Sequence, residues 1–436
     1  MEQKKKYPAT LVVSINAWKD KGGVNTLLNL FKNWNKAKLS QIYTRSDMPQ
    51  TRVCDDFFRI PEIAVVKRVF KPFSKAGERV YTVVGDLTQS QKAQIEAEEK
   101  NKQMIHRSQS WLLTLFREFI WWLGSWKTKE LKQYLADGNW DVVFCPIYPL
   151  IYMNQLQAYV LKRTELKGVA FFGDDNYSYK SGDGSFLFKV HRYFLRKSIR
   201  SVIKKCRDVF VMVPKMQKEY DAEFGIHSIL LTKGIDYDAI PIPDFKDPNK
   251  PIQIVYAGKM IYGRYKSLSA IASALKNINK DGVKAILHIY TPDVITPQLD
   301  AMLNIHNSSV LHKPVPYTEL QKVLVAADMV TFVESLEDNY RYLARLSFST
   351  KITDYFMSGK CIFAIGGDDI APIEYLKEKD AALVCTSYSE IEDKLITIIS
   401  NPSIIKVYAK KAFDCGYKYH NAREVEKKMY NVLSKE

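Results

Sequence analysis

A short segment at residues 347–366 (S-F-S-T-K-I-T-D-Y-F-M-S-G-K-C-I-F-A-I-G) carries the residue types best suited to binding a phosphate. Ser349 and Thr350 are favoured at the amino end of a helix, which we expect over residues 351–357. The first N–H groups of a helix lack partners within it and lie at the positive end of its dipole, so they attract anions. Lys351 places a cation beside them. The segment therefore predicts a phosphate site at the start of this helix.

Asp354 extends this prediction from a phosphate to a nucleotide. It follows Lys351 by about one helical turn and lies on the same face of the expected helix. A carboxylate there can accept hydrogen bonds from ribose hydroxyls, as an acidic residue does in dinucleotide-binding folds. Pyrophosphate and ribose together indicate a nucleotide or a sugar nucleotide. The competing interpretation is purely structural, because capped helices that lead into strands such as 361–365 occur in any α/β protein.

The elements that must position these residues alternate between strand and helix along the whole chain. Repeated βα units imply parallel sheets with helices on both faces, so the predicted class is α/β with two Rossmann-like parallel-sheet domains facing across a cleft. We expect ligands in that cleft, at the carboxyl ends of the strands. The predicted boundaries are a first domain at 1–240, a Pro- and Asp-rich linker at 241–251, a second domain at 252–410 and a C-terminal helical segment at 411–436. Strands are expected at 11–15, 141–144, 169–172, 209–213 and 228–231, and then at 252–257, 285–290, 329–333, 361–365 and 382–385.

Composition narrows the classes of protein that fit. The 436 residues are enough for about two to three domains. No apolar run of about 18 residues predicts a membrane span, and the basic and then apolar N-terminus indicates a solvated tail entering a first strand, not a signal peptide. The six cysteines form no C-x-x-C pair, and no histidine lies at metal spacing from them. We therefore expect no metal site and a reducing, cytoplasmic environment.

The formal net charge of +16 calls for an anionic partner or another explanation, and the candidates are nucleic acid, an anionic membrane surface and anionic substrates. Nucleic acid is the weakest candidate, because the basic residues are dispersed and no nucleic-acid motif occurs. Residues 106–129 hold four of the seven tryptophans between lysines and arginines. Their broad apolar face fits either a helix packed in the first domain or a helix at a membrane interface. Lys67, Arg68, Lys71 and Lys75 favour an anionic membrane surface.

Four segments, taken together and in order, resemble the retaining GT-B glycosyltransferases of the bacterial group 1 (family 4-like) class. The resemblance spans most of the chain and is thin over residues 48–139. It implies the GT-B fold, with the final helix crossing back onto the first domain. The four segments are G-G-V-N-T-L-L-N-L-F at 22–31, Y-D-A-E-F-G-I-H-S-I-L-L-T-K-G-I-D at 220–236 (with Lys233 where Asn is usual), Y-A-G-K-M-I-Y-G-R-Y-K-S-L-S-A-I-A-S-A-L at 256–275, and 347–366.

For the donor, the resemblance implies a site for the pyrophosphate and ribose of a nucleotide sugar. Loss of a nucleoside diphosphate builds negative charge on the pyrophosphate, which fixed cations stabilise. Lys259 and Lys266 stand where the family has Arg and Lys, so both are assigned catalytic as well as binding roles, and Arg264 between them is able to substitute. The predicted donor-binding residues are Gly258, Lys259, Arg264, Lys266, Ser349, Thr350, Lys351 and Asp354.

Besides Lys233, two positions on the donor side depart from the family pattern. Lys259 supplies a point charge where the family has the bidentate fork of an arginine. The family has two acidic residues near the donor, of which Asp354 matches the second, but Leu346 stands where the first is expected. Recognition of the donor sugar is therefore left open. Acidic residues nearby that are candidates for the role are Glu334, Glu337 and Asp338.

For the acceptor, Gly22, Gly23 and Asn25 follow the first strand, where glycine lets the backbone approach a substrate closely. Asp174 and Asp175 follow a later strand, and either can orient or deprotonate an acceptor hydroxyl. A retaining reaction along one face needs no dedicated base, whereas an inverting one does, with Asp175 as the first candidate. The alternatives for this pair are a turn cap and a metal site, although the family generally works without metal.

The predicted function is transfer of a sugar from a UDP- or GDP-linked donor, used as substrate and with no further cofactor. The expected acceptor is a hydroxyl of a glycan or lipid-linked molecule in bacterial surface polysaccharide synthesis, with retention of configuration. We expect a cytoplasmic protein, peripheral on the inner face of the membrane, that binds no nucleic acid. A nucleotide-sugar 2-epimerase of the same fold is one alternative, although histidine is scarce in the expected cleft. A non-catalytic nucleotide-sugar-binding scaffold is the other, because of Leu346.

Overall fold

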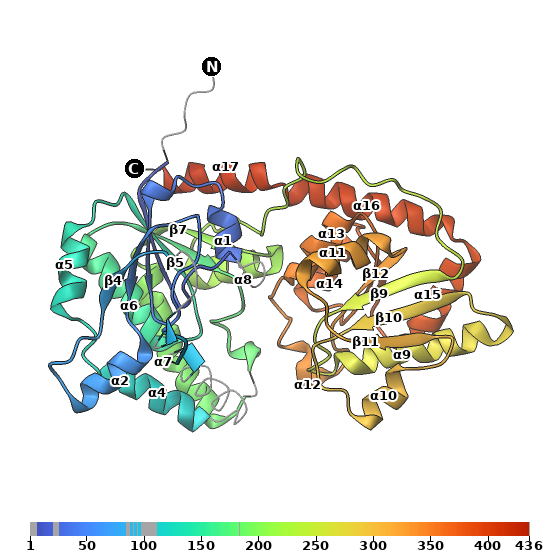
Figure 1. Cartoon of the computed structure of the whole chain (residues 1–436), viewed down its shortest axis with the longest axis horizontal. Coiled ribbons are helices and arrows are strands. Elements are labelled where there is room, and N and C mark those ends of the chain that lie inside the picture. Colours follow the sequence, from blue (N-terminus) through green and yellow to red (C-terminus); the bar gives the residue numbers. More distant parts are fainter. Residues whose placement is uncertain are drawn as a thin grey trace, which may run out of the picture. The chain divides into compact units, whose positions relative to one another are not determined.

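A computed structural model shows two units, each a parallel sheet covered by helices (Figure 1). Unit 1 comprises Met1–Met212, Gln217–Leu231 and Glu426–Glu436, and unit 2 comprises Val213–Met216 and Thr232–Val425. The predicted α/β class with two parallel sheets is confirmed. The structure describes residues 7–20, 26–83, 88–89, 91–93, 95–96, 111–182 and 184–435.

The sheet of unit 1 has the strand order β4-β3-β2-β1-β5-β6-β7-β8, and among its described strands only β3 and β4 pair in antiparallel fashion. The strands are β1 Thr10–Ser14, β2 Leu39–Tyr43, β3 Asp56–Arg59, β4 Glu78–Val80, β5 Val142–Pro146, β6 Gly168–Phe172, β7 Cys206–Val211 and β8 Ile229–Leu230. The helices that belong to this unit in whole or in part are α1 Thr26–Phe31, α2 Glu62–Phe70, α4 Trp111–Leu123, α5 Lys129–Asp137, α6 Ile151–Thr164, α7 Phe186–Ile203, α8 Pro214–Phe224 and α17 Ala422–Leu433.

Strands β2, β3 and β4 were not predicted, and β2 shows why. All of its residues are buried, yet Ser40 and Gln41 are polar, so no apolar run marks it in the sequence. The side-chain amide of Gln41 donates hydrogen bonds to Ser14 Oγ at 2.6 Å and to the Asn16 carbonyl oxygen at 2.9 Å. A buried polar group that is satisfied in this way is tolerated in a core, but it hides the strand from a reading of hydrophobic pattern.

The sheet of unit 2 has the order β11-β10-β9-β12-β13-β14, with parallel neighbours throughout. The strands expected at 252–257, 285–290, 329–333 and 361–365 coincide with β9, β10, β12 and β13, because each is a continuous apolar or near-apolar run. The strands are β9 Ile252–Ala257, β10 Ala285–Tyr290, β11 Ser309–His312, β12 Met329–Val333, β13 Cys361–Ile365 and β14 Leu383–Cys385. The helices are α9 Arg264–Ile278, α10 Pro297–Leu303, α11 Tyr317–Ala326, α12 Asp338–Arg341, α13 Thr350–Ser358, α14 Ala371–Glu378, α15 Ser389–Ser400 and α16 Ser403–Tyr419.

Strand β9 is the point at which the order of this sheet reverses. It pairs with β10 on one side and with β12 on the other, so the chain builds one half of the sheet and then returns to build the second. The loops that leave β9 and β12 therefore run in opposite directions at their carboxyl ends. In open parallel sheets such a switch point leaves a crevice where ligands bind.

The last helix belongs to both units. It follows α16, which packs on α13 and β13 in unit 2. From Glu426 onward α17 is part of unit 1, where Arg207 donates to the carbonyl oxygens of Val432 at 3.2 Å and Leu433 at 3.0 Å. The expected return of the final helix to the first domain is confirmed. Within the described ranges, no helix has both the length and the apolar character needed to span a membrane.

Candidate functional site

The switch point of unit 2 is built around Gly258, the first residue after β9. Its φ of +146° lies in a region that favours glycine, and its N–H donates to the Tyr290 carbonyl oxygen at 2.9 Å. A Cβ added here would lie 2.0 Å from Nζ of Lys351. The absent side chain therefore makes the notch that the Lys351 amine occupies.

Lys351, in the first turn of α13, brings its charge to this notch across the sheet edge. Its Nζ lies 4.8 Å from the centroid of the Tyr256 ring and 3.5 Å from the Tyr256 hydroxyl. Burial, together with the nearby Arg264, lowers the pKa of Lys351 to about 8 against the opposing effect of the Glu334 and Asp293 carboxylates. A cation that has lost much of its hydration gains strongly from an anionic ligand, and such perturbed groups gather at functional sites.

Arg264 and Glu334 form the second charged pair at the switch point. Arg264 opens α9, after the β9 loop, and Glu334 directly follows β12. The guanidinium donates from Nε and Nη2 to the two carboxylate oxygens, each at 2.9 Å. Burial raises the pKa of Glu334, and Arg264 holds it down. Of the three acidic residues considered in place of Leu346, Glu334 bonds Arg264 and Glu337 bonds Lys266. Only Glu334 of these two is buried, and Leu346 itself lies in the core.

The Gly258 notch gives a testable prediction. In the Gly258→Ala variant we expect the affinity for a nucleoside diphosphate to fall by about tenfold or more, because the new methyl group displaces the Lys351 amine. Titration calorimetry with UDP and GDP measures this. The matched control is Gly282→Ala, where φ is also positive (+115°) but no atom lies within 4 Å of the added Cβ. Equal losses in both variants would show that backbone strain, not the notch, is responsible.

The remaining predicted phosphate ligands are less confined. Lys259 and Lys266 are exposed, and Lys266 donates to Glu337 at 2.6 Å. Ser349 stands at the predicted N-cap position of α13, but its side chain makes no capping hydrogen bond. Thr350 is the first helical residue. The first amides of α13 are thus left without a capping side chain, which suits a ligand anion.

Asp354 has partners that the sequence did not suggest. Its Oδ1 accepts hydrogen bonds from the buried Lys233 at 3.0 Å and from the Tyr317 hydroxyl at 3.1 Å. Lys233 is the residue that replaces the family's usual Asn. The structure thus brings Gly258, Arg264 and Lys351 together and gives Asp354 a separate set of contacts. The bond of Asp354 to ribose stays a prediction. The contacts seen here indicate that Asp354 also has a structural role.

We expect Asp354→Asn to lower the free energy of unfolding by about 2 kcal/mol, because buried Lys233 loses its counter-charge. Urea denaturation measures this. Asp380→Asn is the matched control, since Asp380 also accepts bonds from a lysine and a tyrosine, Lys411 and Tyr408, but at the exposed surface. That change should cost less than about 1 kcal/mol. A structural role for Asp354 is wrong if the two variants lose the same stability.

The predicted acceptor residues lie in unit 1. Asp174 is exposed in the loop after β6, and Asp175 is buried there. The Asp175 carboxylate accepts hydrogen bonds from the Ser178 N–H at 2.9 Å and the Tyr220 hydroxyl at 3.0 Å, which is the turn-cap arrangement. Its role toward an acceptor stays a prediction. Gly22, Gly23 and Asn25 lie outside the described residues.

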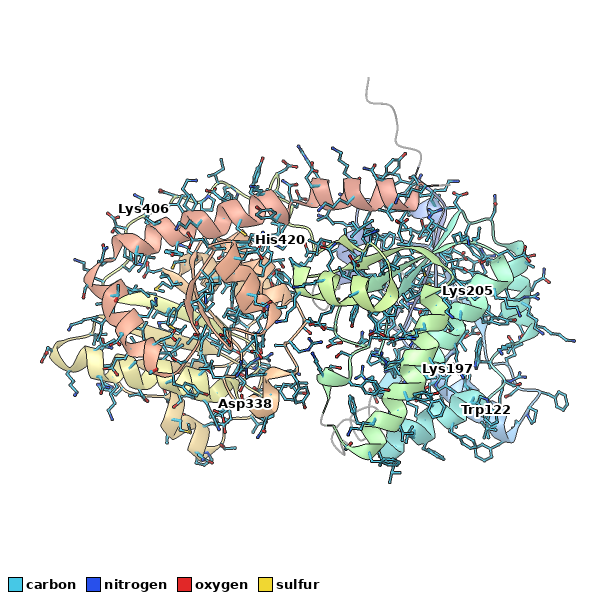
Figure 2. All side chains as sticks on the ribbon, turned by 180° about the vertical axis from the view of Figure 1, so that it is seen from behind. Trp122, Lys197, Lys205, Asp338, Lys406 and His420 are labelled. Atoms are coloured by element: carbon cyan, nitrogen blue, oxygen red, sulfur yellow. The ribbon has the colours of Figure 1, made fainter. Side chains whose placement is uncertain are left out.

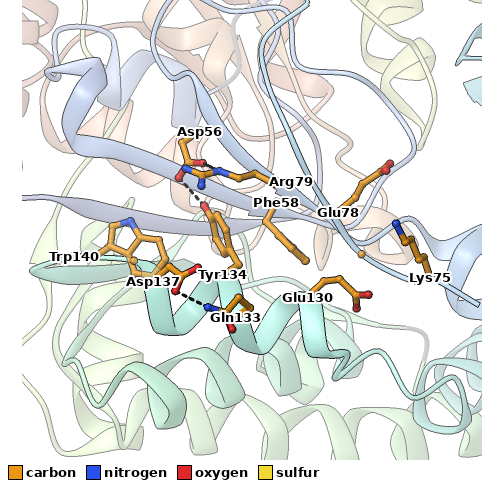
Figure 3. Close-up of a pocket in the computed structure, with 12 residues that line it drawn as sticks. Asp56, Phe58, Lys75, Glu78, Arg79, Glu130, Gln133, Tyr134, Asp137 and Trp140 are labelled. Carbon is orange, nitrogen blue, oxygen red and sulfur yellow. Dashed lines mark hydrogen bonds and ion pairs between the residues drawn. The ribbon is translucent and has the colours of Figure 1, made fainter. Parts of the chain in front are cut away.

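Unit 1 also has a hollow of about 410 Å³ beside β3, β4 and α5 (Figure 3). Several of its polar groups bond one another. Asp56 accepts hydrogen bonds from the Tyr134 hydroxyl at 2.8 Å and from Arg79 Nε at 2.7 Å. Because Asp56 opens β3, this hollow includes the amino end of a parallel strand, and we do not assign it a ligand. In the described part of the chain, no group of three or more His, Cys, Asp or Glu side chains is placed to hold a metal ion.

Comparison with known proteins identifies the fold of this chain. No protein-family model and no curated protein sequence matches the chain. Among solved structures, HepE of Anabaena in complex with UDP and glucose is similar with a TM-score of 0.59 and 10% identity over 98% of this chain and 99% of that one. Sucrose-phosphate synthase from Thermosynechococcus elongatus has a TM-score of 0.59 and 10% identity over 97% and 98%. WaaG, a glycosyltransferase involved in lipopolysaccharide biosynthesis, has a TM-score of 0.53 and 10% identity over 98% and 100%. The chain therefore has the expected GT-B fold.

Proposed function

We propose that this chain is a glycosyltransferase whose unit 2 binds a nucleoside diphosphate sugar. The observation that carries the proposal is the Lys351 amine, largely removed from water in the notch at Gly258, at the point where the sheet order reverses. A structural cation in a core is normally paired with an anion. The Lys351 amine instead contacts a tyrosine ring and hydroxyl beside Gly258. The carboxylates of Glu334 and Asp293 act on its charge from further away, and among the described residues neither forms an ion pair with it, which supports an anionic ligand here.

The chemistry required of such a site is stabilisation of a leaving group. When the bond between the sugar and the diphosphate breaks, negative charge develops on the phosphate oxygen. Lys351, Arg264 and the first amides of α13 are fixed groups that complement this charge, and fixed charges are most effective where water is scarce. Because Arg264 already bonds Glu334 through one edge of its guanidinium, it is held in place before the ligand arrives.

The finer parts of the proposal concern the nucleotide, the acceptor and the residues that contact each of them. UDP is the first nucleotide to test, since the similar HepE structure holds UDP and glucose. A glycan or lipid-linked hydroxyl is the proposed acceptor and surface polysaccharide synthesis the proposed process, in line with the stated role of WaaG in lipopolysaccharide biosynthesis. Retention of configuration follows from the resemblance of the sequence to retaining enzymes. Lys259, Lys266 and Asp354 are proposed to contact the donor from the rim of the same site, and Asp174 or Asp175 to contact the acceptor.

The test begins with thermal stabilisation by UDP-, GDP- and ADP-linked sugars. A true donor should stabilise the protein by about 2.7 kcal/mol at a concentration a hundredfold above its Kd. The stabilising compound is then incubated with the protein and the products are separated. Release of the nucleoside diphosphate with free or transferred sugar supports the proposal. Interconversion of sugar nucleotides would identify an epimerase, and tight binding without turnover a scaffold. Lys351→Met should weaken donor binding and slow the release of the nucleoside diphosphate.

A further inference from the structure

Helix α4 of unit 1 has its charged residues on the side that faces the protein and apolar residues on the side that faces water, the reverse of a normal surface helix. Its charged residues Arg117 and Glu118 and the ring of Trp121 face the protein. Arg117 donates to Glu62 of α2 at 2.5 Å and to the Tyr152 hydroxyl at 3.1 Å. The Glu118 carboxylate accepts hydrogen bonds from the first two N–H groups of α6. Trp121 stacks on Tyr152 with ring centroids 4.0 Å apart. The helix is therefore held firmly by its polar side.

The opposite face of α4 is apolar and faces water. Leu112, Phe116, Phe119 and Leu123 follow the helical spacing of one stripe, and all four are exposed, Phe116 by 61%. Trp122 beside them is 68% exposed and stacks on Phe119 at 5.7 Å between ring centroids. Burying such side chains is favourable, so this face indicates an apolar environment that α4 meets outside the unit.

Neighbouring elements extend the apolar surface and add positive charge. Helix α2 packs against α4, and Phe70 at its end and Phe73 in the following turn are exposed. The exposed Lys67 and Lys71 lie among them. The charge in this part of unit 1 therefore borders the apolar stripe, as it does in helices that lie in a membrane interface.

A basic hollow of about 830 Å³ continues from Trp122 along α6 and α7. Lys127, one of its lining residues, lies 5.3 Å from the ring centroid of Trp126 and 5.5 Å from that of Tyr159. Figure 2 shows Trp122 and Lys205 on one side of the unit. Of the described residues that line the hollow, none is acidic. Its basic residues are Lys127, Lys132, Lys162, Arg163 and Lys205.

We propose that the α4 stripe and this basic hollow together form a docking surface for an anionic lipid bilayer. The stripe enters the interface between head groups and acyl chains, and the hollow receives lipid phosphates. Charge selects this occupant. A second copy of the chain, itself at +16, would bring like charges together, whereas an anionic leaflet attracts each basic residue near its surface. This inference goes beyond the donor site of unit 2 and does not depend on it.

The test is co-sedimentation of the full chain with two kinds of vesicle, phosphatidylcholine alone and phosphatidylcholine mixed with phosphatidylglycerol. We expect strong, salt-sensitive binding to the mixed vesicles. Phe116→Ser should weaken binding by about tenfold, through loss of apolar burial. Lys132→Gln with Lys162→Gln should weaken binding to the mixed vesicles by about tenfold or more, with no change on pure phosphatidylcholine. All three side chains are exposed, so the fold does not depend on them.

Matched controls use the exposed surface of unit 2. Lys276→Gln with Lys406→Gln removes the same charge, and Val294→Ser removes an exposed apolar side chain. Both should leave binding unchanged. The proposal is overturned by equal binding to both vesicles, by absence of binding, or by equal effects of the control and test pairs. It is also overturned if light scattering finds a dimer that Phe116→Ser dissociates, because the stripe then belongs to a second copy of the chain.

Discussion

Replacing Lys351 with methionine is expected to lower kcat/KM for the nucleotide-sugar donor by about a hundredfold to a thousandfold. The substitution keeps most of the side-chain volume in the Gly258 notch and removes only the charge that complements the leaving diphosphate. Because a methionine in this place relieves the burial of a cation, the protein should not lose stability. Steady-state kinetics with the donor found by the stabilisation screen, together with urea denaturation, measure the two effects separately.

Lys360→Met is the matched control for this variant. Lys360 lies just beyond the other end of α13, and burial lowers its pKa as well. Its loss should change kcat/KM by less than about threefold. Lys351 has no special role if the two methionine variants are equally active, or if both lose activity in proportion to a loss of folded protein.

The pH dependence of donor binding offers a second readout of the same amine. Burial lowers the pKa of Lys351 to about 8, so in the free protein the amine is charged below that pH and becomes neutral above it. The diphosphate binds the charged form, and its affinity should therefore fall as pH rises through about 8, approaching roughly tenfold per pH unit. Proton uptake on binding above this pH, seen as a dependence of the binding enthalpy on the buffer, checks the sign. In Lys351→Met this step should be absent.

The sequence predicts the sheet of unit 2 well because its central strands are buried on both faces. A strand such as β13 must then be apolar at every position, and the bounding Gly366 marks where it ends. Lys351 was predicted from the expected start of a helix, and Gly258 and Arg264 from the resemblance to GT-B glycosyltransferases. The structure brings the three together at the switch point.

The pairings within the site could not be predicted, because they depend on strand order. Arg264 and Glu334 meet only because β9 and β12 are neighbours, although β10 and β11 separate them along the chain. The contact of Lys233 and Tyr317 with Asp354 joins three segments in the same way. Hydrophobic period identifies strands and helices but not which of them pair, so a charged residue's partner stays hidden when it lies on another element.

Helix α4 shows a different limit. From the sequence, its broad apolar face fitted either core packing or a membrane interface, and the structure shows one face packed and the other exposed. The polar residues of a surface helix are normally assumed to face water. Arg117 instead bonds Glu62, and Glu118 accepts hydrogen bonds from the first N–H groups of α6. These partners can be identified only when the positions of α2 and α6 are known.

Removing Arg264 is expected to cause the largest loss of stability among these variants. Arg264→Ala leaves the buried Glu334 carboxylate without its bidentate partner, and breaking such a pair costs about 3–5 kcal/mol. Glu334→Gln in the same chain should restore much of the loss, because a neutral amide tolerates burial better than an unpaired charge. Arg341→Ala is the matched control, since its partners Asp338 and Asp369 are exposed, and it should cost less than about 1 kcal/mol.

The loss in Arg264→Ala should also depend on pH with a definite sign. Burial already raises the pKa of Glu334, and without the guanidinium it rises further above that of the unfolded chain. The folded state then binds more protons than the unfolded state between those two values, so stability falls as pH rises through this window and the full loss is present above it. Urea denaturation of both variants at acid and neutral pH measures the difference. A deficit that is the same at every pH, or that Glu334→Gln does not reduce, would show that Arg264 stabilises unit 2 by packing and not by pairing with a buried charge.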